Sequence, residues 1–198
     1  MKFFVTHYTP LVERKQHIIQ NLKDAGIEDY EFIETKDREE LTLEEMHKFM
    51  NITTSELSLF LKHVEIFKMD TGNDIIVVFE DDAILCDNFK IQLDACLFQL
   101  QNETWDALFS GECCNMHCDT GSKLVKQTNQ SRGTCMYVLN KGIGNRLYNI
   151  FCNQSIVTYP IDWWLYKIQP SYNLNYFWSE PTLVSQGSDT GLFKSSLR

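Results

Sequence analysis

The sequence predicts an α/β domain in which helices flank a mixed, mostly parallel central β-sheet. Short apolar runs, each the length of one strand, alternate along the chain with longer segments whose apolar residues recur at helical spacing. One run, residues 75–79, is apolar at every position, as is typical of a strand covered on both faces. An alternation of strands and helices around such a strand favours a parallel sheet between two layers of helices.

The composition fits one such domain over residues 1–198. The chain is 43% hydrophobic and 23% charged, which excludes intrinsic disorder and suits a compact core. No apolar run approaches the roughly 20 residues that a membrane-spanning helix needs. The formal net charge of −9 repels phosphate backbones, so we expect no nucleic-acid partner. A protein this acidic suits an anionic substrate only where a cation lies between the two.

Strands are predicted where short apolar runs end at polar or turn-forming residues. These runs are residues 2–8, 30–35, 75–79, 105–110 and 133–140. The sequence Thr71-Gly72-Asn73 separates the third run from the helix before it. Residues 111–132 are polar, and we expect them to be irregular.

Helices are predicted at residues 10–26, 54–69, 87–101 and 141–152. The first has Pro10 at an early helical position and closes at Gly26. The second is amphipathic, because one of its faces carries Leu57, Phe60, Leu61, Val64 and Phe67. Between the second strand and this helix, the charged residues 37–50 contain a capping-type start at Thr42.

Three consecutive acids, Glu80, Asp81 and Asp82, follow the apolar run at residues 75–79. Open α/β sheets bind ligands at the carboxyl ends of their strands, which is where these acids fall. Adjacent carboxylates repel each other unless a cation or backbone donors neutralise them. Mg²⁺ and Mn²⁺ prefer carboxylate oxygens and in turn hold diphosphates. The sequence therefore indicates a metal site here, and the alternative is a solvated turn after the strand.

Seven segments in this order resemble glycosyltransferase family 25, which includes lipooligosaccharide and procollagen galactosyltransferases. They are Val5-Thr-His-Tyr8, Thr53 to His63, Val77 to Ala83, Trp105 to Gly111, Gly133 to Leu139, Pro160-Ile-Asp162 and Pro181 to Gln186. The resemblance implies a GT-A fold, with a Rossmann-like half of about residues 1–110 that binds a nucleotide sugar. It places acceptor binding in about residues 111–198, within the same continuous sheet.

The resemblance also implies the reaction. A hexose, galactose or glucose, moves with inversion from a UDP-sugar to a hydroxyl of a glycan or glycoprotein acceptor, with Mn²⁺ or Mg²⁺ as the cofactor. Glu80-Asp81-Asp82 matches the Glu-Asp-Asp form of the family's metal-binding DxD motif. Asp82 is the direct metal ligand in this match, and Glu80 reaches the ribose or a metal-bound water. The remaining donor-site residues it implies are Thr6, His7, Tyr8, Arg14, Thr35, Asp37, His63, Asp81 and Gln186.

Some of these positions have a second interpretation from their residue type alone. His63 lies on an apolar helix face, where a hydrogen-bonded core histidine is equally expected. Lys62 stands where the family usually has Ser, and it either supplies a cation to the diphosphate or points to solvent. Gln186 either contacts the diphosphate or metal, or is a polar loop residue.

An inverting transfer needs a general base within hydrogen-bond reach of the acceptor hydroxyl. Asp162 is the candidate, because it follows Pro160 and lies beside the apolar pair Trp163-Trp164, which would raise its pKa. The alternative is that Asp162 caps the helix that follows. Asp189 is a competing base or a second metal contact. The tryptophans are individually expected in the core, although aromatic faces also stack on sugars.

The chain start and the cysteines bear on location and on a second metal site. Phe3-Phe4-Val5 is too short for the core of a signal peptide, so we expect a cytoplasmic protein, with the inner face of a membrane and a viral factory as alternatives. The densest cysteine cluster, residues 113–118, lacks the spaced pairs of a zinc site. We therefore interpret it as a loop with reduced thiols.

Two other functions compete with the transferase. A catalytically inactive relative could bind a glycan or a protein, but three adjacent acids would be a needless cost in a binding module. An unrelated Mg²⁺-dependent phosphotransfer or nucleotidyl-transfer enzyme would need a phosphate-binding glycine-rich loop, and no G-x-x-x-x-G-K sequence is present.

Overall fold

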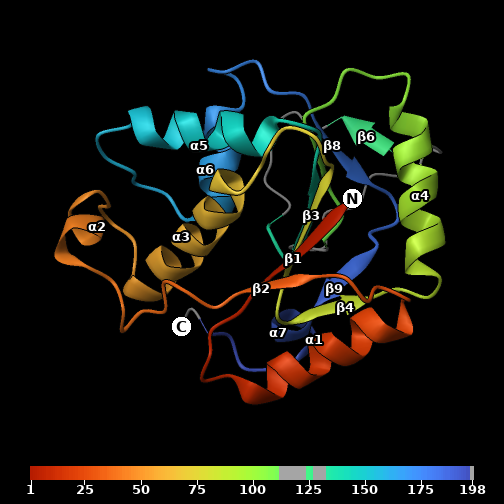
Figure 1. Ribbon diagram of the computed structural model, residues 1–198, viewed down its shortest axis with the longest axis horizontal. Helices are drawn as coiled ribbons and strands as arrows, with labels where there is room; N and C mark the ends of the chain where they lie inside the picture. Colours follow the sequence, from red (N-terminus) through yellow and green to blue (C-terminus); the bar gives the residue numbers. More distant parts are fainter. Residues whose placement is uncertain (112–123, 127–132, 197–198) are drawn as a thin grey trace.

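The computed structural model describes residues 1–111, 124–126 and 133–196 (Figure 1). In this part of the chain the main sheet has seven strands in the order β2-β1-β3-β7-β5-β8-β6. They are β1 (Lys2–Thr6), β2 (Glu31–Ile33), β3 (Ile76–Glu80), β5 (Ala107–Phe109), β6 (Leu124–Lys126), β7 (Met136–Leu139) and β8 (Tyr176–Ser179). Only β6 and β7 run against the others, because β7 pairs antiparallel with β3 and β5, and β6 with β8. The mixed, mostly parallel α/β fold is confirmed.

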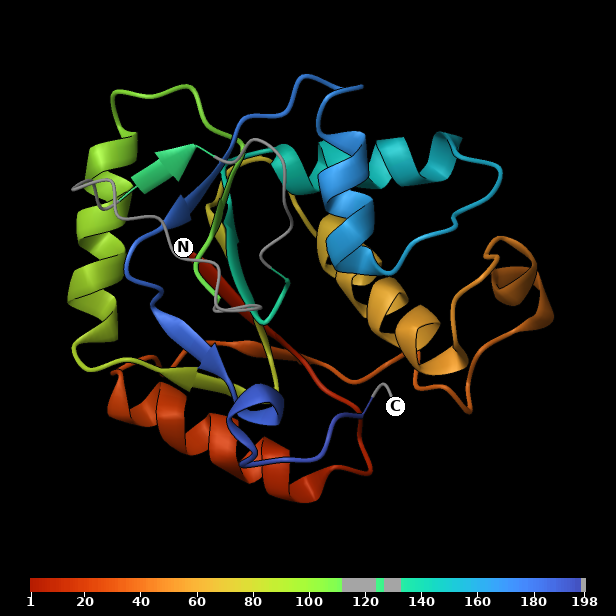
Figure 2. The ribbon, with the colours of Figure 1, turned by 180° about the vertical axis from the view of Figure 1, so that it is seen from behind.

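Helices cover both faces of this sheet, as Figures 1 and 2 show. The helices of the described residues are α1 (Val12–Asp24), α2 (Leu43–His47), α3 (Thr54–Lys68), α4 (Phe89–Leu100), α5 (Ile143–Asn153), α6 (Ile161–Ile168) and the short α7 (Gly187–Thr190), and of these α2 lies at the periphery, beyond α3. One core lies under α3, α5 and α6, and the other under α1 and α4. Successive strand residues serve opposite cores: Val78 and Tyr137 pack into the first, Val77 and Val138 into the second.

Local sequence signals explain where several helices begin and end. α2 and α3 each start with a capping box, formed by Thr42 with Glu45 and by Thr53 with Glu56. The capping start predicted at Thr42 is confirmed. Gly26 follows α1 with a φ of +69°, a conformation that glycine adopts without strain.

Four short strands were not predicted, and two of them matter for the site. β8 adds to the main sheet beside β5, and β4 (Ala83–Leu85) pairs antiparallel with β9 (Val184–Gln186). Runs of three or four residues carry too little periodicity to be recognised, because a distant partner strand specifies them. The β4–β9 pair brings residues 184–188 next to the acidic triplet. β6 lies in the stretch expected to be irregular, so that expectation is wrong at residues 124–126.

Candidate active site

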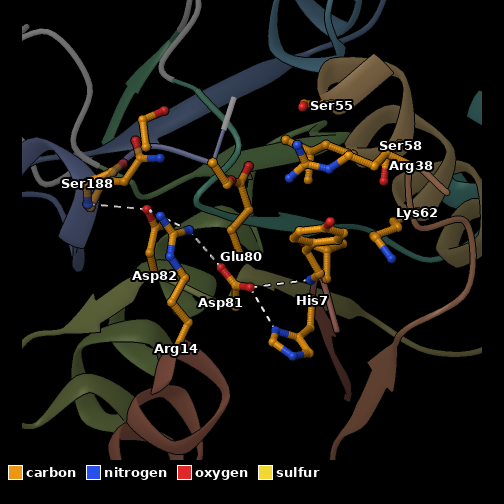
Figure 3. Close-up of a pocket in the computed structure, with 16 residues that line it drawn as sticks. His7, Arg14, Arg38, Ser55, Ser58, Lys62, Glu80, Asp81, Asp82 and Ser188 are labelled. Atoms are coloured by element: carbon orange, nitrogen blue, oxygen red, sulfur yellow. Dashed lines mark hydrogen bonds and ion pairs between the residues drawn. The ribbon is translucent and has the colours of Figure 1, made fainter. Parts of the chain in front are cut away.

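The acidic triplet begins at the carboxyl end of β3, which lies between parallel β1 and antiparallel β7. A pocket opens there, between the end of β1, the start of α3 and residues 186–196 (Figure 3). Of the thirteen predicted site residues, eight line it: Thr6, His7, Tyr8, Arg14, Glu80, Asp81, Asp82 and Gln186. The strand order β2-β1-β3 reverses between β1 and β3, and an open α/β sheet usually binds its ligand at the carboxyl ends of the strands beside such a reversal.

Asp81 is fully engaged by its neighbours. Its Oδ2 lies 2.8 Å from Nδ1 of His7 and accepts a longer hydrogen bond, 3.4 Å, from the backbone N–H of Tyr8. Its Oδ1 accepts a hydrogen bond of 3.0 Å from Arg14. These contacts join β1, α1 and the end of β3. Asp81 therefore holds the site together and has little capacity left for a ligand.

Asp82 differs from Asp81 in having one oxygen without a partner. Its Oδ2 accepts a hydrogen bond from the backbone N–H of Ser188 at 3.3 Å and lies 3.5 Å from Nη1 of Arg14. Its Oδ1 is buried and has no hydrogen-bond partner among the described residues. Burial raises the pKa of Asp82, and the nearby Arg14 partly opposes that shift. A buried oxygen without a partner is unusual in a folded protein and suggests a place for a ligand.

Glu80 is the third acid and the most strongly perturbed. Burial, with the negative charge of Asp82 as the next cause, raises its pKa to about 8. Its Oε1 accepts a hydrogen bond of 2.6 Å from the hydroxyl of Thr134. In this environment Glu80 favours either a proton or a nearby positive charge.

These residues fit a divalent metal ion. Mg²⁺ and related ions usually take one or two carboxylates and complete their shell with water and substrate phosphates. Asp82 Oδ1 and Glu80 offer that partial set. No trio of His, Cys, Asp or Glu side chains converges on one point in the described part of the chain. A complete protein cage is therefore not formed here, and substrate oxygens would supply the remaining ligands.

The opposite wall of the pocket is built on a buried ion pair. Lys62 donates to Oδ1 of Asp37 at 2.7 Å and to the backbone carbonyl of Thr35 at 2.8 Å. Oδ2 of Asp37 accepts hydrogen bonds from the backbone N–H and the hydroxyl of Thr9. The interpretation that Lys62 points to solvent is wrong, because the side chain is 2% exposed. Thr35 and Asp37 lie behind this wall and support it rather than line the pocket.

His63 is a hydrogen-bonded core histidine, one of the two interpretations of its position on an apolar helix face. Its Nδ1 lies 2.7 Å from the hydroxyl of Tyr137, and burial lowers its pKa to about 3, so the ring is neutral. Its Nε2 lies 3.9 Å from Oε1 of Glu80. His63 thus stands behind Glu80 and outside the pocket lining.

Comparison with known protein families identifies the family of the chain. The sequence model of glycosyltransferase family 25, described as an LPS biosynthesis protein, matches residues 1–165. The chain belongs to glycosyltransferase family 25. The resemblance inferred from the seven segments is confirmed.

One solved structure shares the fold of this chain. The crystal structure of a glycosyltransferase involved in the glycosylation of the major capsid of PBCV-1 gives a TM-score of 0.50 at 10% identity, over 93% of this chain and 92% of that one. A nucleoside-diphosphate-sugar pyrophosphorylase from Vibrio cholerae RC9 gives 0.35 at 16% identity over 89% and 71%, a score that supports no inference. No curated protein sequence matches the chain.

Asp162, the predicted base of this glycosyltransferase, lies in the first turn of α6. The helix begins at Ile161 with Pro160 at the N-cap position, so the interpretation of Asp162 as the N-cap is wrong. The Asp162 carboxylate nevertheless accepts a hydrogen bond from the backbone N–H of Trp163 in the first turn. Burial raises its pKa, and its negative charge in turn raises the pKa of Glu80. Asp162 is therefore close enough to the triplet for the two charges to interact. Asp189 is exposed on α7 and does not line the pocket.

The tryptophans beside Asp162 have different environments. Trp164 is 2% exposed and donates from Nε1 to the side chain of Gln154, so it belongs to the core as expected. Trp178 is also buried. Trp163 is 45% exposed and meets the ring of Tyr166 edge-on, so the core expectation is wrong for this residue.

The sequence did not point to several residues that line the pocket. They are Arg38, Ser55, Ser58, Leu59, Ser188, Ser195 and Ser196. Arg38 lies over the ring of Tyr8, with its guanidinium carbon 4.2 Å from the ring centre. Ser188 neighbours the predicted Asp189, and the β4–β9 pairing brings it to Asp82. Serines in polar loops carry no motif of their own, so no local signal could have identified them.

Two predictions concern regions away from the pocket. The cysteine cluster at residues 113–118 lies outside the described residues. None of the helices in the described part of the chain is long and apolar enough to cross a membrane.

Proposed function

We propose that this family 25 glycosyltransferase moves a hexose from a UDP-sugar to a hydroxyl of a glycan or protein-linked acceptor, with inversion and with Mn²⁺ or Mg²⁺. The observation that carries the proposal is the buried Oδ1 of Asp82, which has no partner among the described residues and lies beside Glu80 in the pocket at the end of β3. Galactose and glucose are the expected sugars.

Charge supports a nucleoside diphosphate as the donor. The protein is a net anion, and its pocket holds three adjacent acids, so the diphosphate needs positive charge beside it. Arg14 and Arg38 line the same pocket and supply positive charge, whereas Lys62, which also lines it, is paired with Asp37. Asp82 and Glu80 would hold the metal ion. When bound, the ion would neutralise charge on the leaving diphosphate.

The wall opposite the acids suits the nucleoside. The ring of Tyr8 and the guanidinium of Arg38 stack there, and the hydroxyls of Ser55 and Ser58 line the space beside them. Aromatic and guanidinium planes both pack well against a base. We retain the division into a donor half, about residues 1–110, and an acceptor half, about residues 111–198, with Gln186 and Ser188 of the second half also reaching the donor pocket.

Asp162 is the residue we assign as general base. Its carboxylate would accept the proton of the acceptor hydroxyl while that oxygen bonds to the anomeric carbon. The bond from the anomeric carbon to the diphosphate oxygen breaks in the same step, and its electron pair leaves with the UDP. Burial raises the pKa of Asp162 and makes it a better base. The exposed Trp163 next to it offers an aromatic face to an acceptor sugar.

UDP release from a panel of UDP-sugars tests the proposal. Each sugar is incubated with the purified protein and Mn²⁺, with EDTA, or with the isosteric variant Asp82→Asn. We expect one hexose donor to release UDP faster than the others, only with metal, and not with the variant. Asp189→Asn serves as the matched control and should behave as wild type, because Asp189 lies outside the pocket. No release from any donor under any metal condition would overturn the proposal.

A further inference from the structure

Residues 192–196, which we call the strap, are anchored beside α1 by Phe193. The backbone N–H of Phe193 donates to the carbonyl of Gly187 at 3.0 Å. Its ring meets His17 edge-on at 5.2 Å and lies under the guanidinium of Arg14 at 5.3 Å. A Cβ added to Gly187 would come within 2.8 Å of the Phe193 ring. Gly187 thus allows the ring to pack directly against the backbone.

The strap is also connected to the acidic triplet through Arg14. One terminal nitrogen of this buried guanidinium donates to Oδ1 of Asp81, and the other donates to the backbone carbonyl of Lys194 at 2.5 Å. The segment leading into the strap binds the triplet too, because the N–H of Gly187 donates to the carbonyl of Asp82 at 2.8 Å. The path of the strap therefore depends on the same residues that form the site.

Directly after Lys194, the next two residues reach the pocket. Ser195 and Ser196 line it together with Tyr8, Arg14 and Asp82. The strap approaches from the side of α1, opposite the wall formed by Lys62. Serine hydroxyls donate hydrogen bonds to phosphate oxygens, and a fixed guanidinium nearby adds positive charge.

We propose that the strap is a wall of the donor site, in which Ser195 and Ser196 bind the diphosphate of the nucleotide sugar. This inference rests on the proposed function and adds a binding element to it. The strap lies beyond residues 1–165, the part of the chain that the family model matches. Phe193 and Arg14 are positioning residues with respect to the strap, since they hold it in place while the hydroxyls of Ser195 and Ser196 contact the diphosphate.

Charge substitutions in the strap give a sharp test. UDP is titrated calorimetrically, with Mn²⁺, into wild type and into four variants. At Ser195 and at Ser196 the serine is replaced once by Asp and once by Asn, which has the same shape as Asp without its charge. A carboxylate beside the diphosphate should weaken UDP binding about tenfold, whereas the neutral amide should change it little. Ser155→Asp, on an exposed loop, controls for the added net charge and should bind UDP as wild type does.

Phe193→Ala provides a second, independent variant. Loss of the ring should loosen the strap and weaken UDP binding several-fold, while circular dichroism and the thermal midpoint report whether the protein stays folded. If wild type binds UDP and both Asp variants bind it equally tightly, the strap proposal is overturned while the proposed function stands. If wild type binds no UDP with Mn²⁺, both are overturned.

Discussion

Two charged networks face each other across the pocket, and they differ in whether their polar atoms have partners. In the wall beside α3, Lys62 and Asp37 form one buried pair, and both oxygens of Asp37 accept hydrogen bonds. In the triplet, Asp81 and Asp82 share Arg14, and Asp81 also contacts His7, whereas Oδ1 of Asp82 has no partner among the described residues.

The difference separates structural support from ligand binding. A buried pair with all its hydrogen bonds made fixes the positions of the elements it joins. A buried cluster with excess charge and an unpartnered oxygen is costly, so its retention favours a ligand that completes it. We therefore expect substitutions in the first network to damage the fold, and substitutions in the second to damage binding and catalysis.

The largest effect on stability is expected from Lys62→Met. It leaves the Asp37 carboxylate buried without its cation, which should lower the free energy of unfolding by about 3–5 kcal/mol. Urea denaturation measures this change. Lys68→Met is the matched control, because Lys68 is exposed and its contact with Glu65 is 3.9 Å, so a loss within about 0.5 kcal/mol is expected. Equal losses for the two variants would show that the Lys62 pair is not the structural network.

Next in size is the effect of Asp162→Asn on catalysis. The amide keeps the shape of the side chain and cannot accept a proton, so kcat should fall by about 100-fold or more. The affinity for UDP should stay at the wild-type value, since Asp162 does not line the donor pocket. A variant with wild-type kcat would remove Asp162 from the mechanism.

The pH dependence of kcat sharpens the same assignment. Burial raises the pKa of Asp162 above 3.8, with a further contribution from the charge of Glu56, and Glu80 also lies within electrostatic range. The base must be ionised to accept a proton, so kcat should be low at pH values below this raised pKa and should rise as the pH passes through it. The acid limb of the kcat–pH profile should therefore have its midpoint above the ordinary pKa range of aspartate. This limb should be absent from the pH profile of the residual activity of Asp162→Asn. Retention of the same limb in the variant would assign it to another group.

The smallest effect is expected from Asp82→Asn on the stability of the metal-free protein. The raised pKa of Asp82 means that its ionised form destabilises the fold at pH values above that pKa. Removing the charge should therefore raise the free energy of unfolding at pH 8. Urea denaturation in EDTA checks the sign, which is opposite to that for Lys62→Met. A clear destabilisation would place Asp82 in the structural network instead.

The sequence predicted those parts of the site that depend on local pattern. The triplet follows a fully apolar strand, so neighbouring residues alone indicate that it lies at a strand end. The role of Asp162, which is inferred from Pro160 and the adjacent tryptophans, stays a prediction. The Lys62–Asp37 pair joins residues 25 positions apart, and Arg14 contacts Lys194 across 180 positions. Such contacts depend on the order of the strands, and the placement of antiparallel β7 between β3 and β5 has no local signal.

The most direct test of the central claim is a calorimetric titration of UDP into the metal-free protein, with Mn²⁺ added or with EDTA, for wild type, Asp82→Asn and Asp189→Asn. The account predicts that wild type and Asp189→Asn bind UDP only with Mn²⁺ and that Asp82→Asn loses this binding. Equal UDP binding in EDTA, or in Asp82→Asn with Mn²⁺, would contradict the claim that the unpartnered oxygen of Asp82 marks a metal-dependent donor site.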